Sequence, residues 1–368
     1  MELTYLDNSA TTQVEEASAN VAVEMMLQDF GNPSSLHYMG SKALDCLSVA
    51  RHQVAQTLCC ATDSVVFCSS GTMANNIAID GCVKRGRKVV VSGGEHSSVL
   101  KPAESLRRKG FEVVVVPLSF GGKPCVEDIL EAVDEDTALL SMMTVNNETG
   151  AVFPVEEITA RVHAKNPSTL IHTDHVQGFG KIRFSVTEAG VDFATISGHK
   201  IHAPKGAAAI YIKDMDTMGH LFWGGSQERG MFPGTENVPA FCAFGDASFR
   251  RMSNMQEEHA HVSRLREYLL QCLSEIDGIV VNSPEDSIPH IVNISIPGHD
   301  SYGIVSSLSA DNVFVSAGAA CERGAASHVL KAMGLPDDMV GSALRISMSH
   351  ANTKHDIDRF VGCLTKYI

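Results

Sequence analysis

Several positions in the sequence carry side chains that can bind or react with a small molecule, and each follows a short apolar segment. Lys200 lies in FATISGHKIHAPKGAAAIYI, a stretch with few other charges. A lysine held in apolar surroundings gives up its proton more readily and can form a Schiff base. Asp174 follows TLIHT, His96 follows KVVVSGGE, and Gly71 and Thr72 follow SVVFCSS.

Each of these positions has a simpler explanation when it is considered alone. Gly71 and Thr72 are typical of a helix start, and an isolated acid such as Asp174 often caps a helix. A lone lysine after a strand is usually a surface residue. The combination favours chemistry, because pyridoxal phosphate needs a lysine for an imine, an acid at its pyridine nitrogen, a stacking ring and a phosphate site at a helix N-terminus.

The region from about residue 64 to 212 alternates strand-like and helix-like segments. We expect strands at 64–70, 88–94, 111–118, 137–145, 169–174, 191–198 and 207–213, and helices at 72–86, 97–110, 126–133 and 155–165. This alternation favours a mostly parallel α/β sheet covered on both faces. Ligands of such sheets lie beyond the carboxyl ends of the strands. Asn146, Asn147 and Glu148 follow another strand, where they either contact a ligand or shape the turn.

We expect a second, smaller unit after about residue 250. Residues 251–276 have the pattern of a long amphipathic helix, and a mixture of strand-like and helix-like segments follows. A chain of 368 residues is long enough for two domains. We therefore predict a large domain at 14–250 and a small α+β domain made of 1–13 and 251–368.

The composition disfavours several classes of protein. The formal net charge of −14 argues against nonspecific nucleic-acid binding, which requires basic patches. The beginning, MELTYLDNSATT, lacks the basic and apolar regions of a signal peptide, and the longest apolar runs are too short to span a bilayer. The ten cysteines form no CxxC pair, so we expect neither a disulfide framework nor structural zinc. We predict a cytoplasmic protein without membrane association.

Eleven ordered motifs resemble the cysteine desulfurases of the NifS/IscS type, within the class V aminotransferase fold. They run from residue 5 to about residue 348 and so cover nearly the whole chain. The resemblance implies a pyridoxal-phosphate transferase of fold type I, whose large domain holds a mostly parallel seven-stranded sheet. The motifs are YLDNSATT, FGNPSSLH, SSGTMANN, EHSSVL, VNNETG, HTDHVQGFGK, SGHKIHAPKG, GGSQERG, PGTENV, SAGAAC and ALRISMS.

The resemblance also implies a role for each candidate residue. Lys200 would form the imine with pyridoxal phosphate. Arg345 would clamp the substrate carboxylate, a task for which a guanidinium suits better than an ammonium. The other implied contacts are Gly71, Thr72, Ser197 and His199 with the phosphate, Asp174 with the pyridine nitrogen, Gln177 with the phenolic oxygen, His96 with the ring and in proton transfer, Asn147 with ring and substrate, and Thr235 with the phosphate of a neighbouring subunit.

The implied reaction converts L-cysteine to L-alanine. Lys200 would act as the base at Cα, and the thiolate of Cys321 would take the substrate sulfur as a persulfide. The sulfur would then pass to an acceptor or scaffold protein, for iron–sulfur cluster assembly or for thiolation. The family is homodimeric, with sites at the subunit interface. No resident metal is expected, and contact of Cys321 with a transferred iron–sulfur cluster is left open.

Other reactions on the same fold remain as alternatives. A selenocysteine lyase would recognise the same amine and carboxylate, and another enzyme of the class V aminotransferase fold, such as a transaminase, would not need Cys321. A non-enzymatic scaffold paralogue is disfavoured because Lys200 and Asp174 are both present.

Several positions depart from the family pattern. Met73 stands where an acid is usual, and Ser97 where a second histidine or a lysine is common. His175 replaces a small residue, and we favour packing over titration near the cofactor for it. The stretch CERGAASHVL after the sulfur-accepting position is shorter than in the long-loop subgroup, which leaves the identity of the acceptor open.

Overall fold

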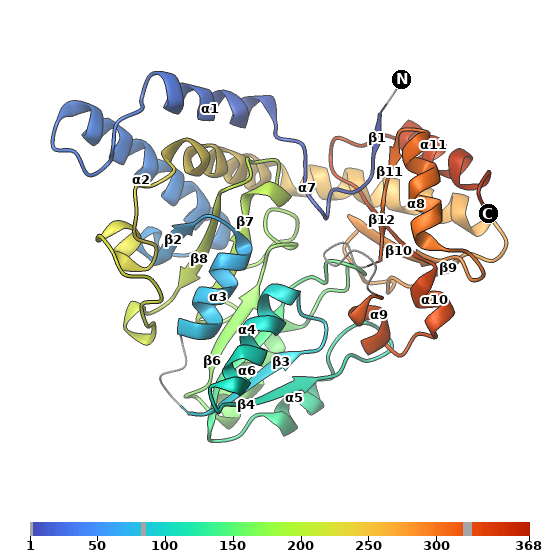
Figure 1. Cartoon of the computed structure of the whole chain (residues 1–368), viewed down its shortest axis with the longest axis horizontal. Coiled ribbons are helices and arrows are strands. Elements are labelled where there is room, and N and C mark those ends of the chain that lie inside the picture. The colour runs from blue at the N-terminus through green and yellow to red at the C-terminus, as the bar shows by residue number, and fades with distance from the viewer. Residues whose placement is uncertain (1–2, 82–85, 319–325) are drawn as a thin grey trace.

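One long helix joins two groups of elements that follow one another along the chain (Figure 1). The structure, a computed structural model, describes residues 3–81, 86–318 and 326–368. Cys321, which we predict to accept the sulfur, lies outside the described residues.

The first group is built on a seven-stranded sheet with the strand order β2-β8-β7-β6-β5-β3-β4. β8 runs antiparallel to β2 and β7, and the other neighbouring pairs are parallel. The prediction of a mostly parallel α/β sheet is therefore confirmed. The strands are β2 (Val65–Cys68), β3 (Lys88–Ser92), β4 (Glu112–Val116), β5 (Thr137–Met143), β6 (Leu170–Asp174), β7 (Phe193–Ser197) and β8 (Ala208–Ile212).

Helices cover both faces of this sheet, since successive strand residues point to opposite sides. Val65 and Phe67 of β2 belong to the apolar cluster that includes side chains of α2, α6 and α7, whereas Val66 and Cys68 belong to the cluster that includes those of α3 and α4. Both faces are thus buried, which explains the almost continuous apolar strands of the sequence. The helices of this group are α1 (Glu16–Leu27), α2 (Tyr38–Leu58), α3 (Gly71–Gly81), α4 (Ser97–Arg108), α5 (Val126–Ala132) and α6 (Val155–Lys165).

Two helices differ from the ranges that we predict. α3 ends at Gly81 rather than at residue 86, and residues 82–85 lie outside the described residues. α7 spans 37 residues, Val238–Ser274, whereas the sequence pattern indicates a start at residue 251. Its first turns lack an amphipathic stripe because nearly every residue from 238 to 248 is buried, and periodicity alone does not detect such a helix.

α7 crosses the molecule and leads into the second group of elements (Figure 1). A four-stranded sheet there has the order β12-β13-β10-β9, and β1 pairs in parallel with β11, so the amino-terminal residues join this group. Residue 250, where we predict the large domain to end, lies inside α7. The elements are β1 (Thr4–Tyr5), β9 (Val280–Val281), β10 (Ile291–Ser295), α8 (Ser301–Ala310), β11 (Val313–Phe314), β12 (Ser316–Ala317), α9 (His328–Ala332), α10 (Asp337–Gly341), β13 (Ala343–Ser347) and α11 (Lys354–Leu364).

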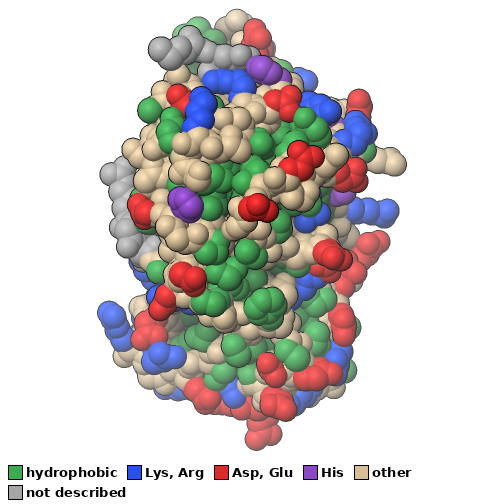
Figure 2. Space-filling view, turned by 90° about the vertical axis from the view of Figure 1, so that its right-hand side faces the viewer, with side chains coloured by type: hydrophobic (Ala, Val, Ile, Leu, Met, Phe, Trp, Pro, Cys, Tyr) green, Lys and Arg blue, Asp and Glu red, His purple; other side chains and the backbone are tan. Residues whose placement is uncertain are grey.

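The surface is mixed in character on the side that Figure 2 shows. Acidic side chains gather along its lower edge, and hydrophobic ones are interspersed with polar ones above. Within the described part of the chain, no helix is both long enough and apolar enough to cross a bilayer.

Candidate active site

A pocket of about 300 Å³ lies at the carboxyl ends of the central strands, between the two groups of elements. Its walls come from the segments after β2, β3, β5, β6 and β7, from the amino-terminal segment and from β13. The site residues predicted from the sequence that line it are Gly71, Thr72, His96, Asn147, Asp174, Gln177, Ser197, His199, Lys200 and Arg345.

Two residues of the prediction do not line this pocket in the described structure. Thr235 is exposed and lies outside the lining, in the segment before α7. This exposure is compatible with a contact to another subunit, which stays a prediction. Cys321 belongs to the residues that the structure does not describe.

One end of the pocket offers donors to an anion. Gly71 begins α3, so the first N–H groups of an eleven-residue helix face this end. The Ser197 hydroxyl is buried and has no hydrogen-bond partner among the described residues. A Cβ at position 71 would lie 3.2 Å from Cγ2 of Val176 and 3.5 Å from Cβ of Ser197, so glycine keeps this end open.

His199 borders the same end of the pocket. Burial lowers the pKa of His199 to about 3, with a further contribution from the neighbouring charge of Lys200. The imidazole is therefore neutral near pH 7. Its Nδ1 lies 3.2 Å from the Thr11 hydroxyl, and the Thr12 hydroxyl donates to the His199 backbone oxygen. The amino-terminal segment thus holds His199 in place.

A chain of hydrogen bonds connects Asp174 to His96. Nδ2 of Asn75 donates to Oδ2 of Asp174 and to the Ser98 hydroxyl, at 2.8 Å in both cases. The Ser98 hydroxyl lies 2.7 Å from Nδ1 of His96, and the Ser98 N–H donates to the same nitrogen. His96 therefore caps α4 and also lines the pocket, so capping the helix does not prevent it from contacting a ligand.

Lys200 lies against the amino-terminal segment. It ends the turn that follows β7, and its Nζ donates to the backbone oxygens of Ser9 at 2.5 Å and Ala10 at 2.8 Å. Both oxygens belong to the motif YLDNSATT, whose individual residues received no role in the sequence analysis. Because Nζ of Lys200 bonds to these two oxygens, the segment that follows β1 is part of the site.

Arg345 projects from β13 towards the opposite wall. Its side chain is 1 % exposed, Nη1 donates to the Asn147 backbone oxygen at 3.0 Å, and Nη2 pairs with Asp7 at 2.9 Å. Nε has no hydrogen-bond partner among the described residues. The guanidinium is thus oriented by one carboxylate and one carbonyl and retains donors for an anionic group.

The turn after β5 divides its polar residues between two tasks. The Asn146 side chain accepts from the N–H groups of Glu148 and Thr149 and so shapes the turn, whereas Asn147 lines the pocket. Glu148 is buried, and burial raises the pKa of its carboxyl group. The Ser327 hydroxyl donates to Glu148, which ties the start of α9 to this turn.

The departures at Met73, Ser97 and His175 lie outside the lining of the pocket, whereas the stretch after the sulfur-accepting position belongs in part to residues that the structure does not describe. His175 is buried, contacts the Thr144 hydroxyl at 2.8 Å and packs against the Phe184 ring, and burial lowers its pKa to about 3. The packing role that we favour for it is confirmed. Met73 packs against the apolar cluster under α3 and α4, and Ser97 is the first residue of α4.

Several residues that support the site were not predicted from the sequence. Asn75 follows Gly71 by one helical turn, and a polar side chain at that spacing could have indicated a common face. Ser98, Lys181 and Asp7 carried no such signal, because their partners come from other elements. Lys181 donates to Oε1 of Gln177 at 3.1 Å.

Comparison with known proteins places this geometry in a family. Residues 4–360 match the family of class V aminotransferases. The chain belongs to this family. Its curated relatives include the cysteine desulfurase IscS of Clostridium botulinum, 34 % identical, with 99 % of this chain and 94 % of the relative covered. Cysteine desulfurase 2 of Trichormus variabilis is 35 % identical, and the alignment covers 98 % of this chain and 91 % of the relative.

Solved structures of the class V family agree with the fold. A NifS-like protein has a TM-score of 0.94 and 34 % identity, and 99 % of each chain is covered. DndA from Streptomyces lividans has a TM-score of 0.79 and 34 % identity, covering 94 % of this chain and 99 % of the other. The type I fold implied by the motifs is therefore confirmed.

The pocket fits pyridoxal phosphate, the cofactor on which this family of enzymes depends. The unpartnered Ser197 hydroxyl and the start of α3 match a phosphate group. Among the described lining residues, Asp174 supplies the one carboxylate, as a protonated pyridine nitrogen requires. Lys200 supplies the amine in the same pocket.

Proposed function

We propose that this chain is a cysteine desulfurase that converts L-cysteine to L-alanine and transfers the sulfur to Cys321. The observation that carries the proposal is the meeting of Lys200, Asp174 and Arg345 in one pocket of a class V fold. Relatives named cysteine desulfurases, aligned over nearly the whole chain, support the choice of reaction.

We assign the cofactor contacts as the family resemblance implies. Lys200 would bond to pyridoxal phosphate, Asp174 would pair with its ring nitrogen, and Gln177 would donate to its phenolic oxygen. The bound cofactor supplies an electron sink that makes the Cα proton of the substrate acidic. Lys200 is then the base that we assign to take that proton, and His96 the second proton carrier beside the ring.

We assign Arg345 to the substrate carboxylate. The guanidinium is already oriented by Asp7 and Asn147, so little side-chain entropy is lost when an anion binds. The Asp7 carboxylate is the group that a substrate carboxylate would compete with. Asn147, whose backbone oxygen accepts from Arg345, is the neighbour that we expect to contact the substrate as well.

We assign Cys321 as the sulfur acceptor. Its thiolate would form an S–S bond with the substrate sulfur while the C–S bond breaks, with both electrons of that bond retained by carbon and a proton added there to give alanine. The described residues on either side support this position. The Gly318 N–H donates to the Ala343 backbone oxygen on β13, and Ser327 donates to Glu148, so both described flanks are bonded to segments that also carry pocket-lining residues.

We propose a homodimer as the functional unit. Exposed apolar side chains cluster on α1 and on the start of α2, where a second copy would cover them. Thr235, exposed before α7, would contact the phosphate in the partner's site. The apolar residues are Val23, Met26, Leu27, Phe30, Leu36 and Tyr38.

We propose that the persulfide passes to an acceptor or scaffold protein in the cytoplasm. A reducing compartment suits a reactive thiol, and the eight cysteines among the described residues are all unpaired. We expect neither membrane nor direct nucleic-acid partners, in keeping with the net charge of −14.

The test is product analysis of the purified protein loaded with pyridoxal phosphate. L-cysteine should yield alanine, and mass spectrometry should find one additional sulfur on Cys321 before any reductant is added. Cys321→Ala should lose both, whereas Cys125→Ala, an exposed cysteine before α5, should retain both. Full alanine production by Cys321→Ala would refute the persulfide role, and pyruvate with ammonia would favour a different class V reaction.

A further inference from the structure

Lys181 is a second lysine beside the pocket, and the proposed reaction gives it no task. It follows the last residue of β6 by seven positions, and its Nζ donates to Oε1 of Gln177 at 3.1 Å. Gln177 itself lines the pocket and is 4 % exposed. The contact therefore reaches the pocket through an intermediate side chain.

An ammonium next to an amide determines which way the amide points. A protonated lysine has three N–H donors and no acceptor, so while Lys181 is protonated only the amide oxygen can face it favourably. With Oε1 turned to Lys181, the Gln177 NH₂ group must point the other way, and it donates to the Ser9 backbone oxygen at 3.0 Å. A flipped amide would bring donors against donors.

The two lysines are connected through this amide. The Ser9 oxygen that accepts from Gln177 also accepts from Nζ of Lys200 at 2.5 Å. Hydrogen bonds thus run from Lys181 through Gln177 and the Ser9 oxygen to Lys200. When Lys200 bonds to the cofactor and leaves that oxygen, the orientation of the amide still depends on Lys181.

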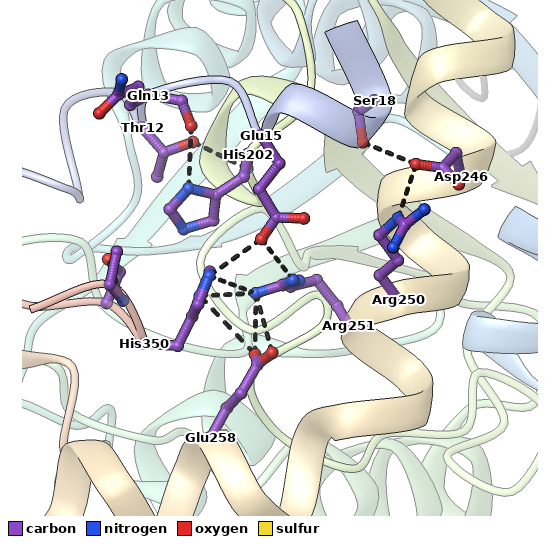
Figure 3. A network of polar contacts seen from close by, with 12 residues as sticks. Thr12, Gln13, Glu15, Ser18, His202, Asp246, Arg250, Arg251, Glu258 and His350 are labelled. Carbon is purple, nitrogen blue, oxygen red and sulfur yellow. Dashed lines mark hydrogen bonds and ion pairs between the residues drawn. The ribbon is translucent and has the colours of Figure 1, made fainter. Parts of the chain in front are cut away.

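Glu258 is the one carboxylate among the described residues that line the small cavity beside Lys181, and it is paired with Arg251. Arg251 pairs with Glu15 at 2.5 Å and with Glu258 at 2.9 Å, and His350 lies 2.9 Å from Glu15 (Figure 3). The ion pairs within the described ranges include none for Lys181. Titratable and charged residues that line the small cavity behind Lys200 are Lys181, Lys200, Arg251, Glu258, His202, His259, His290 and His350.

In these surroundings, the hydrogen bond to the Gln177 side chain is the main polar contact of Lys181 among the described residues. Burial, together with the neighbouring charges of Lys200 and Arg345, lowers the pKa of Lys181 to about 7. A lysine that serves only stability would be expected to gain a carboxylate partner, and the half-buried Lys181 has none among the described residues. Holding an amide donor in one orientation is a task that accounts for the observed contact.

We infer that Lys181 is a positioning residue for the cofactor: by fixing Oε1 of Gln177, it directs the amide N–H group to the phenolic oxygen of pyridoxal phosphate. The inference rests on the proposed function, since it deepens the role assigned to Gln177. If Lys181 has this role, the side chain at position 181 must donate a hydrogen bond to Oε1 of Gln177 and must not accept one.

The test is a pH titration of the visible absorption of the bound cofactor, with no substrate present. A donated N–H favours the charged phenolic oxygen, so losing it should move the midpoint upward by about one pH unit in Lys181→Met. Lys181→Arg, which also donates without accepting, should titrate like the unmodified protein. Lys165→Met, an exposed lysine on α6, is the matched control.

A double-mutant cycle separates positioning from a simple charge effect. If Lys181 acts through Gln177, then Lys181→Met combined with Gln177→Leu should shift the midpoint no further than Gln177→Leu alone. Additive shifts, or an unchanged midpoint in Lys181→Met, would overturn the inference. Lys181→Gln, whose amide imposes no orientation, replaces the methionine variant if that does not fold. Absence of the absorption band in the unmodified protein would instead count against the proposed function.

Discussion

The Arg345 side chain is buried and held in one orientation. Binding of the substrate carboxylate should therefore be sensitive even to replacement of this arginine by lysine. A lysine cannot keep the contacts to Asp7 and the Asn147 oxygen while presenting two parallel donors to a substrate carboxylate. We expect Arg345→Lys to lower kcat/KM for L-cysteine by about 10- to 100-fold, the loss of one or two hydrogen bonds between charged groups. Steady-state kinetics should show the change mainly in KM, and an unchanged KM would contradict the assignment.

Asn75 supports the cofactor through Asp174 without being part of any reaction step. Removing its amide leaves Oδ2 of Asp174 and the Ser98 hydroxyl without a shared donor. We expect Asn75→Ala to weaken binding of pyridoxal phosphate about tenfold, as for one lost hydrogen bond to a charged group. Fluorescence titration of the cofactor-free protein measures this. Asn76→Ala is the control, because that side chain is half-buried and, among the described residues, donates to the backbone oxygen of Thr72 rather than to the pocket.

The sequence predicts the reacting residues of the site better than their supports. Lys200 and Asp174 stand directly after apolar strands, and strand ends of a parallel sheet meet at one edge, so their proximity follows from local pattern. Asn75 and Lys181 act through contacts to other elements. The spacing of Asn75 from Gly71 indicates a shared helix face but not the partners of Asn75, and Lys181 lacks even that signal, because both depend on how α3 and the turn after β6 pack.

The start of α7 also could not be predicted from the local sequence pattern. Its second half carries an amphipathic pattern, but its first half is buried nearly all round, so the true start at Val238 was missed. That buried half positions the site, because a Cβ on Gly198 would lie only 2.9 Å from the Phe244 ring. The turn that carries Lys200 therefore rests directly on α7.

Phe244 is the residue through which this support can be tested. It is fully buried, with ring centroids 6.3 Å from Phe67 and 6.0 Å from Phe179. We expect Phe244→Ala to lower the free energy of unfolding by about 3–5 kcal/mol, through lost burial and the cavity left behind. Phe249→Ala, on the same helix but 44 % exposed, should change it by less than about 0.5 kcal/mol in denaturant unfolding. Equal effects of the two variants would contradict the supporting role.

The whole molecule carries several histidines that burial keeps neutral. Burial lowers the pKa to about 3 for His172, His175, His199 and His202, which lie in β6 or in the segments that follow β6 and β7. In the unfolded chain each would titrate near 6.5. Since the folded pKa lies below the unfolded one, the unfolded state takes up protons first as the pH falls. Stability is therefore greatest above about pH 6.5 and is lost towards pH 3.

His172 offers the cleanest measurement of this dependence, because it is fully buried and lies away from the pocket lining, between the hydroxyls of Ser141 and Thr195. From pH 7 to pH 5 its contribution to the free energy of unfolding should fall by about 2 kcal/mol. Denaturant unfolding of His172→Gln at both pH values should thus show a smaller pH dependence than the unmodified protein, whatever the variant costs at pH 7. His52→Gln, at an exposed position of α2, should keep the original dependence, and an equal dependence in His172→Gln would show that this histidine is not held neutral by the fold.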